Sequence, residues 1–209
     1  MTKATKTQTN RAKTEANILR AAETVFAQKG FAGTAMDAVA KQAGLSKQLI
    51  IYYFPGKEKL YQAVLENMID LWLEKMQFND DPSASPADII SDYIRQKIEL
   101  SRDYPNGSKV FAHEIINGAP VLKTYLIENL RPAFERDITI IERWIAAGLV
   151  KPIDPKHLFF TIWAATQTYA DFSTQIQLLL DKPSLTQEDF DGATQFLCQF
   201  VLSALGIKS

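Results

Sequence analysis

Two short helical segments joined by a tight turn, between residues 30 and 60, constrain this 209-residue chain more than any other feature. The first segment has one apolar helix face, formed by residues at i, i+3, i+4 and i+7, namely Met36, Val39, Ala40 and Ala43. Gly44 follows where a helix commonly ends in a left-handed residue, and Ser46 suits the N-cap of a second helix over residues 47–53.

The flanking residues support the same two helices. Thr34 is a good N-cap for the first helix, and Asp37 can return a hydrogen bond to the Thr34 backbone as a variant of the capping box. Pro55 and Gly56 stop the second helix. Two helices with a turn of small residues between them form the helix-turn-helix pattern.

The second helix carries side chains that suit contact with DNA. Lys47 and Gln48 lie in its first turn, where Lys can donate to guanine and Gln can pair with adenine. Tyrosine hydroxyls and a lysine at the start of the next helix suit phosphate oxygens. The predicted DNA contacts are Thr34, Ser46, Lys47, Gln48, Tyr52, Tyr53 and Lys57. The alternative is a small helical hairpin with a solvated polar face.

The segment from Ile18 to Leu60 resembles the DNA-binding domain of the TetR family of transcriptional repressors. The resemblance rests on residues 18–22 (ILRAA), Phe26, Gly30, Phe31, Gly33, Thr34, Ala40, 43–46 (AGLS), 52–54 (YYF) and 57–60 (KEKL). One departure is Ile51, where many family members have tyrosine. The resemblance implies an operator-binding domain.

The distribution of charge separates the chain into two parts. Residues 1–60 carry a net charge of +6, whereas the rest carries −7, although the overall charge is only −1. This asymmetry is typical of a basic module that binds nucleic acid and an acidic module that stays off it. Residues 1–12 have no apolar period and are predicted to be a disordered basic tail, either simply solvated or adding DNA contacts from Lys3, Lys6 and Arg11.

Composition excludes several classes of protein. The single Cys198 excludes an intramolecular disulfide framework, and no metal-ligand spacing is present. No secretory signal and no apolar run of 18 residues is found, so we expect a cytoplasmic protein with no membrane partner.

The apolar periods predict an all-α chain. We expect a helix-turn-helix domain of three helices over 13–60 and a larger helical domain for ligand binding and dimerisation over 61–209. The expected helices are 13–28, two in the helix-turn-helix, 57–78, 87–102, one from Ser108 to about 117, 120–147 with a kink at Arg131-Pro132, 155–180 and 186–205. Residues 79–86 are expected to be a loop.

The last two expected helices are apolar over more than one stripe. A wide apolar surface requires two partners, which are the domain core and a second subunit. We therefore predict a homodimer, in which Phe196 and Phe200 lie at the interface. A dimer also suits helix-turn-helix recognition of two half-sites.

Aromatic side chains with a few polar residues among them indicate a small-molecule site in the second domain. The predicted ligand-binding residues are Trp72, Phe111, His113, Asn117, Trp163, Gln167, Tyr169 and Asp171. Among them, Trp163, Gln167 and Asp171 share one helix face, where an indole and an amide suit a small planar heterocycle. The alternative is that the aromatic rings are core and that the polar groups satisfy nearby backbone.

The second domain also resembles TetR regulators of pyrimidine breakdown in enteric bacteria, whose effectors are uracil and thymine. The matching residues are 93–95 (YIR), Lys97, 101–105 (SRDYP), 118–120 (GAP), 152–155 (PIDP), 157–158 (HL), 162–164 (IWA), 166–167 (TQ) and 169–172 (YADF). This resemblance implies that Trp72, Trp163 and Gln167 line the effector site. Thr168 and residues 112–117 depart from it, which leaves open another planar or aromatic metabolite.

Three functions follow from these observations. The first is a homodimeric repressor that a small effector, rather than a cofactor, releases from double-stranded operator DNA. The second is a helical enzyme, which lacks support because only His113 and His157 are present and no catalytic motif is found. The third is a constitutive DNA-binding protein with a filled core and no effector.

Overall fold

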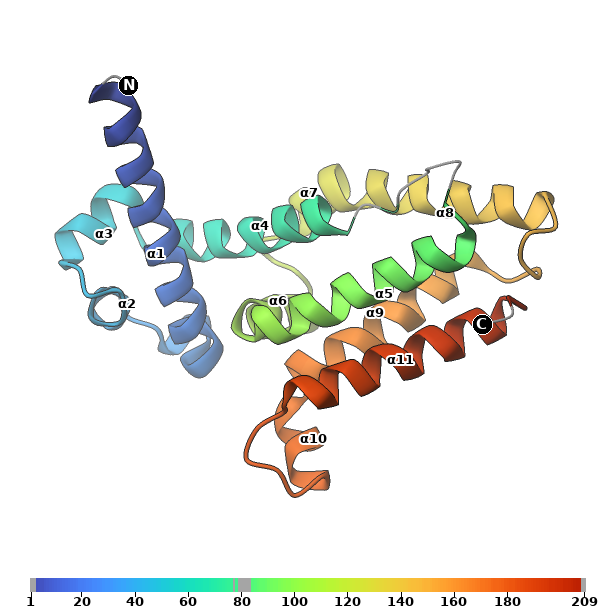
Figure 1. Cartoon of the computed structure of the whole chain (residues 1–209). Helices are drawn as coiled ribbons and strands as arrows, with labels where there is room; N and C mark the ends of the chain where they lie inside the picture. The colour runs from blue at the N-terminus through green and yellow to red at the C-terminus, as the bar shows by residue number, and fades with distance from the viewer. Residues whose placement is uncertain (1–2, 77, 79–83, 208–209) are drawn as a thin grey trace.

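The chain folds into two helical domains that lie end to end (Figure 1). The computed structural model describes residues 3–76, 78 and 84–207, with side chains from residue 10 onward, and every regular element in this part is helical, as predicted. The first domain contains α1 (Lys3–Gly33), α2 (Met36–Ala43) and α3 (Lys47–Tyr53), and α4 (Lys57–Lys75) leads out of it. The second contains α5 (Pro86–Asp103), α6 (Pro105–Ile116), α7 (Lys123–Tyr125), η1 (Leu126–Leu130), α8 (Arg131–Ala146), α9 (Pro155–Asp171), α10 (Ser173–Leu179) and α11 (Gln187–Ala204).

Helix α1 is longer than the sequence predicted. Residues 3–12 continue it toward the N-terminus, so the prediction of a disordered tail is wrong for these residues. A formed helix adds further turns more easily than a new one nucleates, which explains why a stretch without an apolar face is helical here. The regular helix breaks at Gly30, whose φ of 66° is left-handed. Residues 1–2 and the side chains of Lys3 and Lys6 lie outside the described part.

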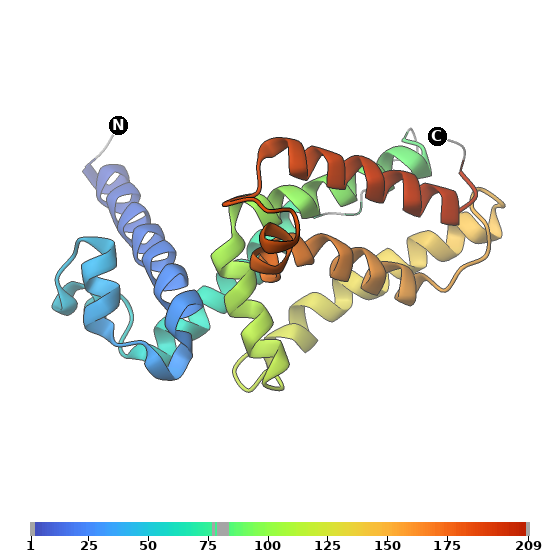
Figure 2. The same cartoon turned by 90° about the horizontal axis from the view of Figure 1, so that it is seen from below.

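The core of the first domain extends into the second. Ile18 and Phe26 of α1, Val39 of α2 and Ile50 of α3 are buried in one cluster, together with α4 as far as Ile69. The second domain contributes two further members to this cluster, which are Val110 of α6 and Leu122 just before α7. Figure 2 shows α6 lying between α1 and the rest of the second domain. The two domains therefore share packing rather than a flexible linker.

The second domain is built on α5, α9 and α11, which pack side by side (Figures 1 and 2). Its core centres on an aromatic group in which the Phe78 ring lies 5.5 Å from Tyr93, 5.4 Å from Trp144 and 5.5 Å from Phe159. Such edge-to-face and tilted pairs stabilise a core beyond the apolar area that they bury.

Several helix boundaries differ from the predicted ones. The predicted helix over 120–147 is divided into α7, the π-helical η1 and α8, because the wider π turn just before Pro132 accommodates a residue without an N–H donor. The predicted helix over 155–180 breaks at Phe172. Helix α6 starts at Pro105, so Ser108 is not its N-cap. Residues 79–83 of the expected loop lie outside the described part.

Candidate nucleic-acid interface and buried lysine cluster

The turn between α2 and α3 has the geometry that the sequence predicted. Gly44 ends α2 in a left-handed conformation, with φ 67° and ψ 30°. The Ser46 hydroxyl then accepts the Leu49 N–H at 3.2 Å and begins α3. Lys47 and Gln48 consequently lie exposed in the first turn of α3, which is the position from which a recognition helix reads base edges.

Lys47 forms an ion pair within the turn. Its ammonium donates to the Asp37 carboxylate of α2 at 2.8 Å, and both side chains are exposed. An exposed pair of this kind contributes little to stability. Lys47 can therefore exchange Asp37 for a guanine or a phosphate at small cost, and Asp37 holds the side chain at the outer surface of α3 in the absence of DNA.

The far end of α3 carries two adjacent tyrosines. Tyr52 is 71% exposed, and its ring meets the edge of Tyr53 with centroids 5.5 Å apart. The Arg11 guanidinium of α1 lies 5.8 Å from the Tyr53 ring, so the N-terminal part of α1 places a cation beside the recognition helix. These three side chains form a surface that suits the phosphate backbone.

Two of the predicted DNA contacts also have a role within the fold. Thr34 is only 4% exposed and donates to the Gly30 carbonyl at 2.7 Å, while Ala35 takes the N-cap position of α2. The Lys57 ammonium donates to the Phe31 carbonyl at 2.9 Å and lies 4.5 Å from the Phe31 ring. Both side chains join the segments on either side of the break at Gly30. Their contact with DNA phosphates stays a prediction.

Four of the predicted ligand-binding residues surround one buried lysine. The Lys97 ammonium of α5 lies 5.0 Å from the centroid of Trp72 and 5.9 Å from that of Trp163. Phe111 packs edge-on against Trp72 at 4.6 Å. The negative charge of Asp171 favours the protonated form of Lys97 and so raises its pKa. We call Trp72, Lys97, Trp163 and Asp171 the buried lysine cluster.

Hydrogen bonds fix the side chains around this cluster. The Trp163 indole N–H donates to the Tyr93 hydroxyl at 2.6 Å, and the Ser108 hydroxyl donates to the Asp171 carboxylate at 2.6 Å. Burial lowers the pKa of Lys97 to about 7, and the charge of Asp171 only partly opposes this effect. Burial likewise raises the pKa of Asp171, while Ser108 and Lys97 act in the opposite direction. A polar ligand that forms hydrogen bonds with Lys97 or Asp171 would therefore offset the cost of removing these charged groups from water.

Of the remaining predicted ligand residues, three lie elsewhere and Gln167 lies next to the cluster along α9. His113 and Asn117 are exposed on the last turn of α6, where they line a separate cavity. Tyr169 packs against Phe190 of α11 at 6.2 Å. Gln167 is half-buried one helical turn from Trp163 on α9. The structure thus places the eight residues in three locations rather than around a single site.

Lys97 is a candidate functional residue that was not among those predicted from the sequence. The sequence contains a sign of this role, because Lys97 lies at helical spacing from Ile90, Ile94 and Ser101, on the buried face of α5. A lysine on the buried stripe of an amphipathic helix is rare unless it is paired or functional.

A helix-turn-helix domain that shares its core with a larger helical domain holding a buried polar cluster defines a ligand-responsive, DNA-binding regulator. Residues 18–64 match the model of the bacterial regulatory proteins of the tetR family, and residues 65–208 match the C-terminal region of YcdC-like proteins. The chain therefore belongs to the TetR family and is a TetR-type transcriptional regulator.

Curated relatives and solved structures agree with this membership. The chain is 45% identical to the HTH-type transcriptional regulator RutR of Escherichia coli K12, over 77% of this chain and 75% of RutR. It is 28% identical to an uncharacterised HTH-type regulator, YfiR, of Bacillus subtilis, over 71% of this chain and 74% of YfiR. A tetR-family protein from Rhodococcus RHA1 has the same fold, with a TM-score of 0.75 at 21% identity, over 94% of this chain and 99% of that one. None of the helices in the described residues combines the length and apolarity that a membrane crossing requires.

Proposed function

We propose that this chain acts in the cytoplasm as a homodimeric repressor, which uracil, thymine or a closely related planar heterocycle releases from its operator. The observation that carries the effector proposal is the buried lysine cluster, where one ammonium faces two indole rings. The resemblance of the second domain to regulators of pyrimidine breakdown supports the same class of effector.

The chemistry of a pyrimidine dione suits this cluster. Its flat ring can stack on Trp72 or Trp163, and its two carbonyl oxygens can accept hydrogen bonds from the Lys97 ammonium. The Gln167 amide, one turn along α9, can both donate and accept. The buried lysine would exchange an apolar environment for a charge-assisted hydrogen bond, which is about twice as strong as a neutral one.

Helix α4 can connect effector binding to DNA binding. Its first turn follows α3, and its last turns carry Trp72 into the buried lysine cluster. A ligand that shifts Trp72 moves α4, and with it the first domain. A coupling free energy of roughly 1–3 kcal/mol between the two sites would change operator affinity about 5–150-fold.

A thermal-shift screen against uracil, thymine, cytosine and purines tests the effector. A ligand at about 100 times its Kd should stabilise the fold by roughly 2.7 kcal/mol. We expect uracil or thymine to raise Tm and to release operator DNA, and Gln167→Ala to lose both responses while still binding the operator. No shift with any pyrimidine, but a shift with another metabolite, would retain the repressor and reject the pyrimidine.

We also propose that the chain is not an enzyme. The curated relatives above are transcriptional regulators, which supports this proposal. Incubation of the purified protein with the compounds that raise its Tm should return them unchanged. Sustained conversion of any of them would revive the enzyme hypothesis, whereas absence of every ligand shift would favour a constitutive DNA-binding protein.

A further inference from the structure

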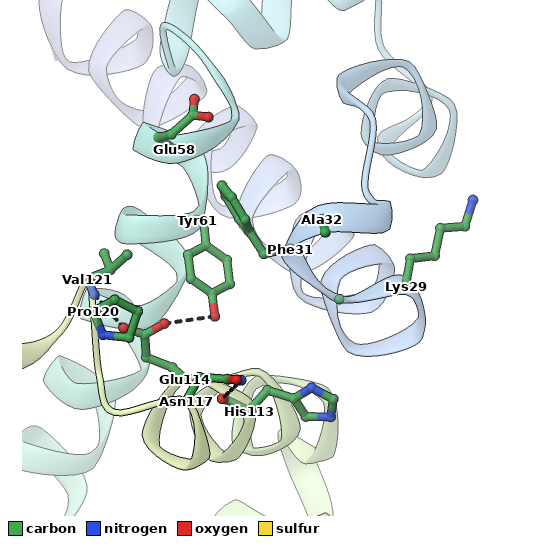
Figure 3. Close-up of a pocket in the computed structure, with 11 residues that line it drawn as sticks. Lys29, Phe31, Ala32, Glu58, Tyr61, His113, Glu114, Asn117, Pro120 and Val121 are labelled. Carbon is green, nitrogen blue, oxygen red and sulfur yellow. Dashed lines mark hydrogen bonds between the residues drawn. The ribbon is translucent and has the colours of Figure 1, made fainter.

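A cavity of about 600 Å³ lies at the junction of the two domains, apart from the buried lysine cluster (Figure 3). Its walls come from the end of α1, the start of α4, and the last turn of α6 with the turn that follows. This volume is within the range that holds drug-sized ligands. We call it the junction cavity.

The junction cavity has a largely apolar and aromatic wall. The rings of Phe31 and Tyr61 lie 4.9 Å apart, and Phe31 is 37% exposed. Pro120 and Val121 line the opposite side. An exposed phenylalanine that faces a cavity offers both apolar area and the negative face of its ring.

The charged group that faces into this cavity is the carboxylate of Glu114. It is 3% exposed and accepts the Val121 N–H at 2.6 Å, the Leu122 N–H at 3.0 Å and the Tyr61 hydroxyl at 3.2 Å. Burial and the neighbouring Glu114 raise the pKa of Tyr61, which keeps this hydroxyl a donor. Figure 3 shows Lys29 and Glu58 at the rim, with their charged ends pointing away from the other lining side chains.

We propose that the junction cavity binds an apolar organic cation. Three features of its wall favour positive charge: the Glu114 carboxylate, the faces of two aromatic rings, and the negative C-terminal end of α6. The apolar remainder of the wall selects a hydrophobic cation over a small hydrated one.

An occupant would connect the DNA-binding domain to α6. The Tyr61–Glu114 hydrogen bond already joins α4 to α6 across this junction. A ligand beside it prefers whichever arrangement of the two domains fits it better and so shifts the orientation of α3. The cation is then a second effector that acts independently of the proposed pyrimidine.

Tetraphenylphosphonium and tetraphenylborate test the proposal, because they share one shape and carry opposite charge. Calorimetric titration of the full chain at pH 8, where free imidazole is neutral, should give one phosphonium per chain and binding of the borate at least about tenfold weaker. Equal affinity for the two ions, or no phosphonium binding, would overturn the proposal.

Two isosteric variants separate charge from structure. Glu114→Gln removes the charge and keeps one oxygen that can accept the Val121 and Leu122 N–H groups, while its NH2 can donate to the Tyr61 hydroxyl oxygen. It should weaken phosphonium binding about tenfold. Tyr61→Phe removes one hydrogen bond to Glu114 but keeps the charge and the ring, and should bind as the natural chain does. An equal loss in both variants would assign Glu114 a structural role and reject the charge argument.

A blocking variant locates the site even if Glu114→Gln fails to fold. Val121 is exposed in the turn after α6, so Val121→Trp should fill the junction cavity and abolish phosphonium binding while the Tm is retained. Lys97→Met, in the buried lysine cluster, should leave phosphonium binding unchanged. Phosphonium binding that survives Val121→Trp, or that uracil displaces competitively, would overturn the location.

Discussion

Lys97 has an environment that departs strongly from that of an ordinary lysine. It is 3% exposed, and the two indoles near its ammonium offset only part of the cost of removing a charge from water. A folded protein retains such a residue where its charge has a use, and perturbed groups of this kind concentrate at functional sites. The lowered pKa of Lys97 can therefore be tested without knowing the effector.

The pH dependence of stability should report this burial. The pKa of Lys97 falls from 10.5 to about 7 in the folded state, so between these values the unfolded chain binds more protons. The free energy of unfolding therefore rises with pH over this window. As pH falls toward 7, this gain in stability disappears. In urea titrations, the natural chain should gain up to about 1.4 kcal/mol per pH unit relative to Lys97→Met between pH 7 and 9.

The exposed Lys156→Met is the matched control for this experiment, because it removes a lysine from the outer face of α9. It should follow the natural chain across the same pH range. Parallel curves for the natural chain and Lys97→Met would contradict the depressed pKa of Lys97.

Gln48 is the residue from which base discrimination is expected. It is exposed in the first turn of α3, and its neutral amide can both donate and accept. Gln48→Ala should weaken binding to a selected operator by roughly 1–3 kcal/mol and relax the preference at one base pair. Fluorescence anisotropy with single-base operator variants measures both effects. Gln42→Ala, exposed on α2, is the control and should retain the preference.

At the scale of elements, the stability and the DNA affinity of α3 depend on the same cap. The Ser46 hydroxyl satisfies the Leu49 N–H, so Ser46→Ala should cost about 1 kcal/mol of stability. Ser46→Asp should cap equally well but place a carboxylate near the phosphates. Urea titration should then show stability retained in Ser46→Asp while its DNA affinity falls at low salt. Full DNA affinity in this variant would place the phosphates away from the start of α3.

The start of the recognition helix could be predicted from sequence, because it is determined by residues that lie close to it along the chain. Ser46 and Gly44 act within a few residues of their own positions, and both took the predicted roles. Thr34 failed as a cap because the chain breaks at Gly30, four residues earlier, and the Thr34 hydroxyl donates back to the Gly30 carbonyl. Pattern alone does not reveal which of two nearby backbone groups a hydroxyl will bond.

At the scale of the molecule, the sites depend on packing between segments far apart in sequence. The buried lysine cluster joins α4, α5 and α9, and the junction cavity joins α1, α4 and α6. The spacing along one helix placed Trp163, Gln167 and Asp171 on one face, and Trp163 and Asp171 both act on Lys97. The mixture of aromatic and polar residues also assigned His113 and Asn117 to that site, whereas they line the junction cavity. The sequence could not predict their separation, because the direction of α6 is set by the core that it shares with the first domain.

The outer face of α11 should join two copies of the chain. Phe196 and Phe200 are 64% and 54% exposed, and their rings stack 6.2 Å apart and 14° from parallel, as a flat apolar surface. Burying such rings against a partner is worth roughly 1.5–3 kcal/mol each. In sedimentation, the double variant Phe196→Glu with Phe200→Glu should therefore shift the dimer to monomer.

Loss of the dimer should also weaken operator binding, because two recognition helices are required to read two half-sites. The control is Ile116→Glu, which adds one carboxylate, against two in the double variant, at a 78% exposed position on α6, away from α11. It should remain a dimer. If the double variant sediments as a dimer while folded, the interface lies on another face.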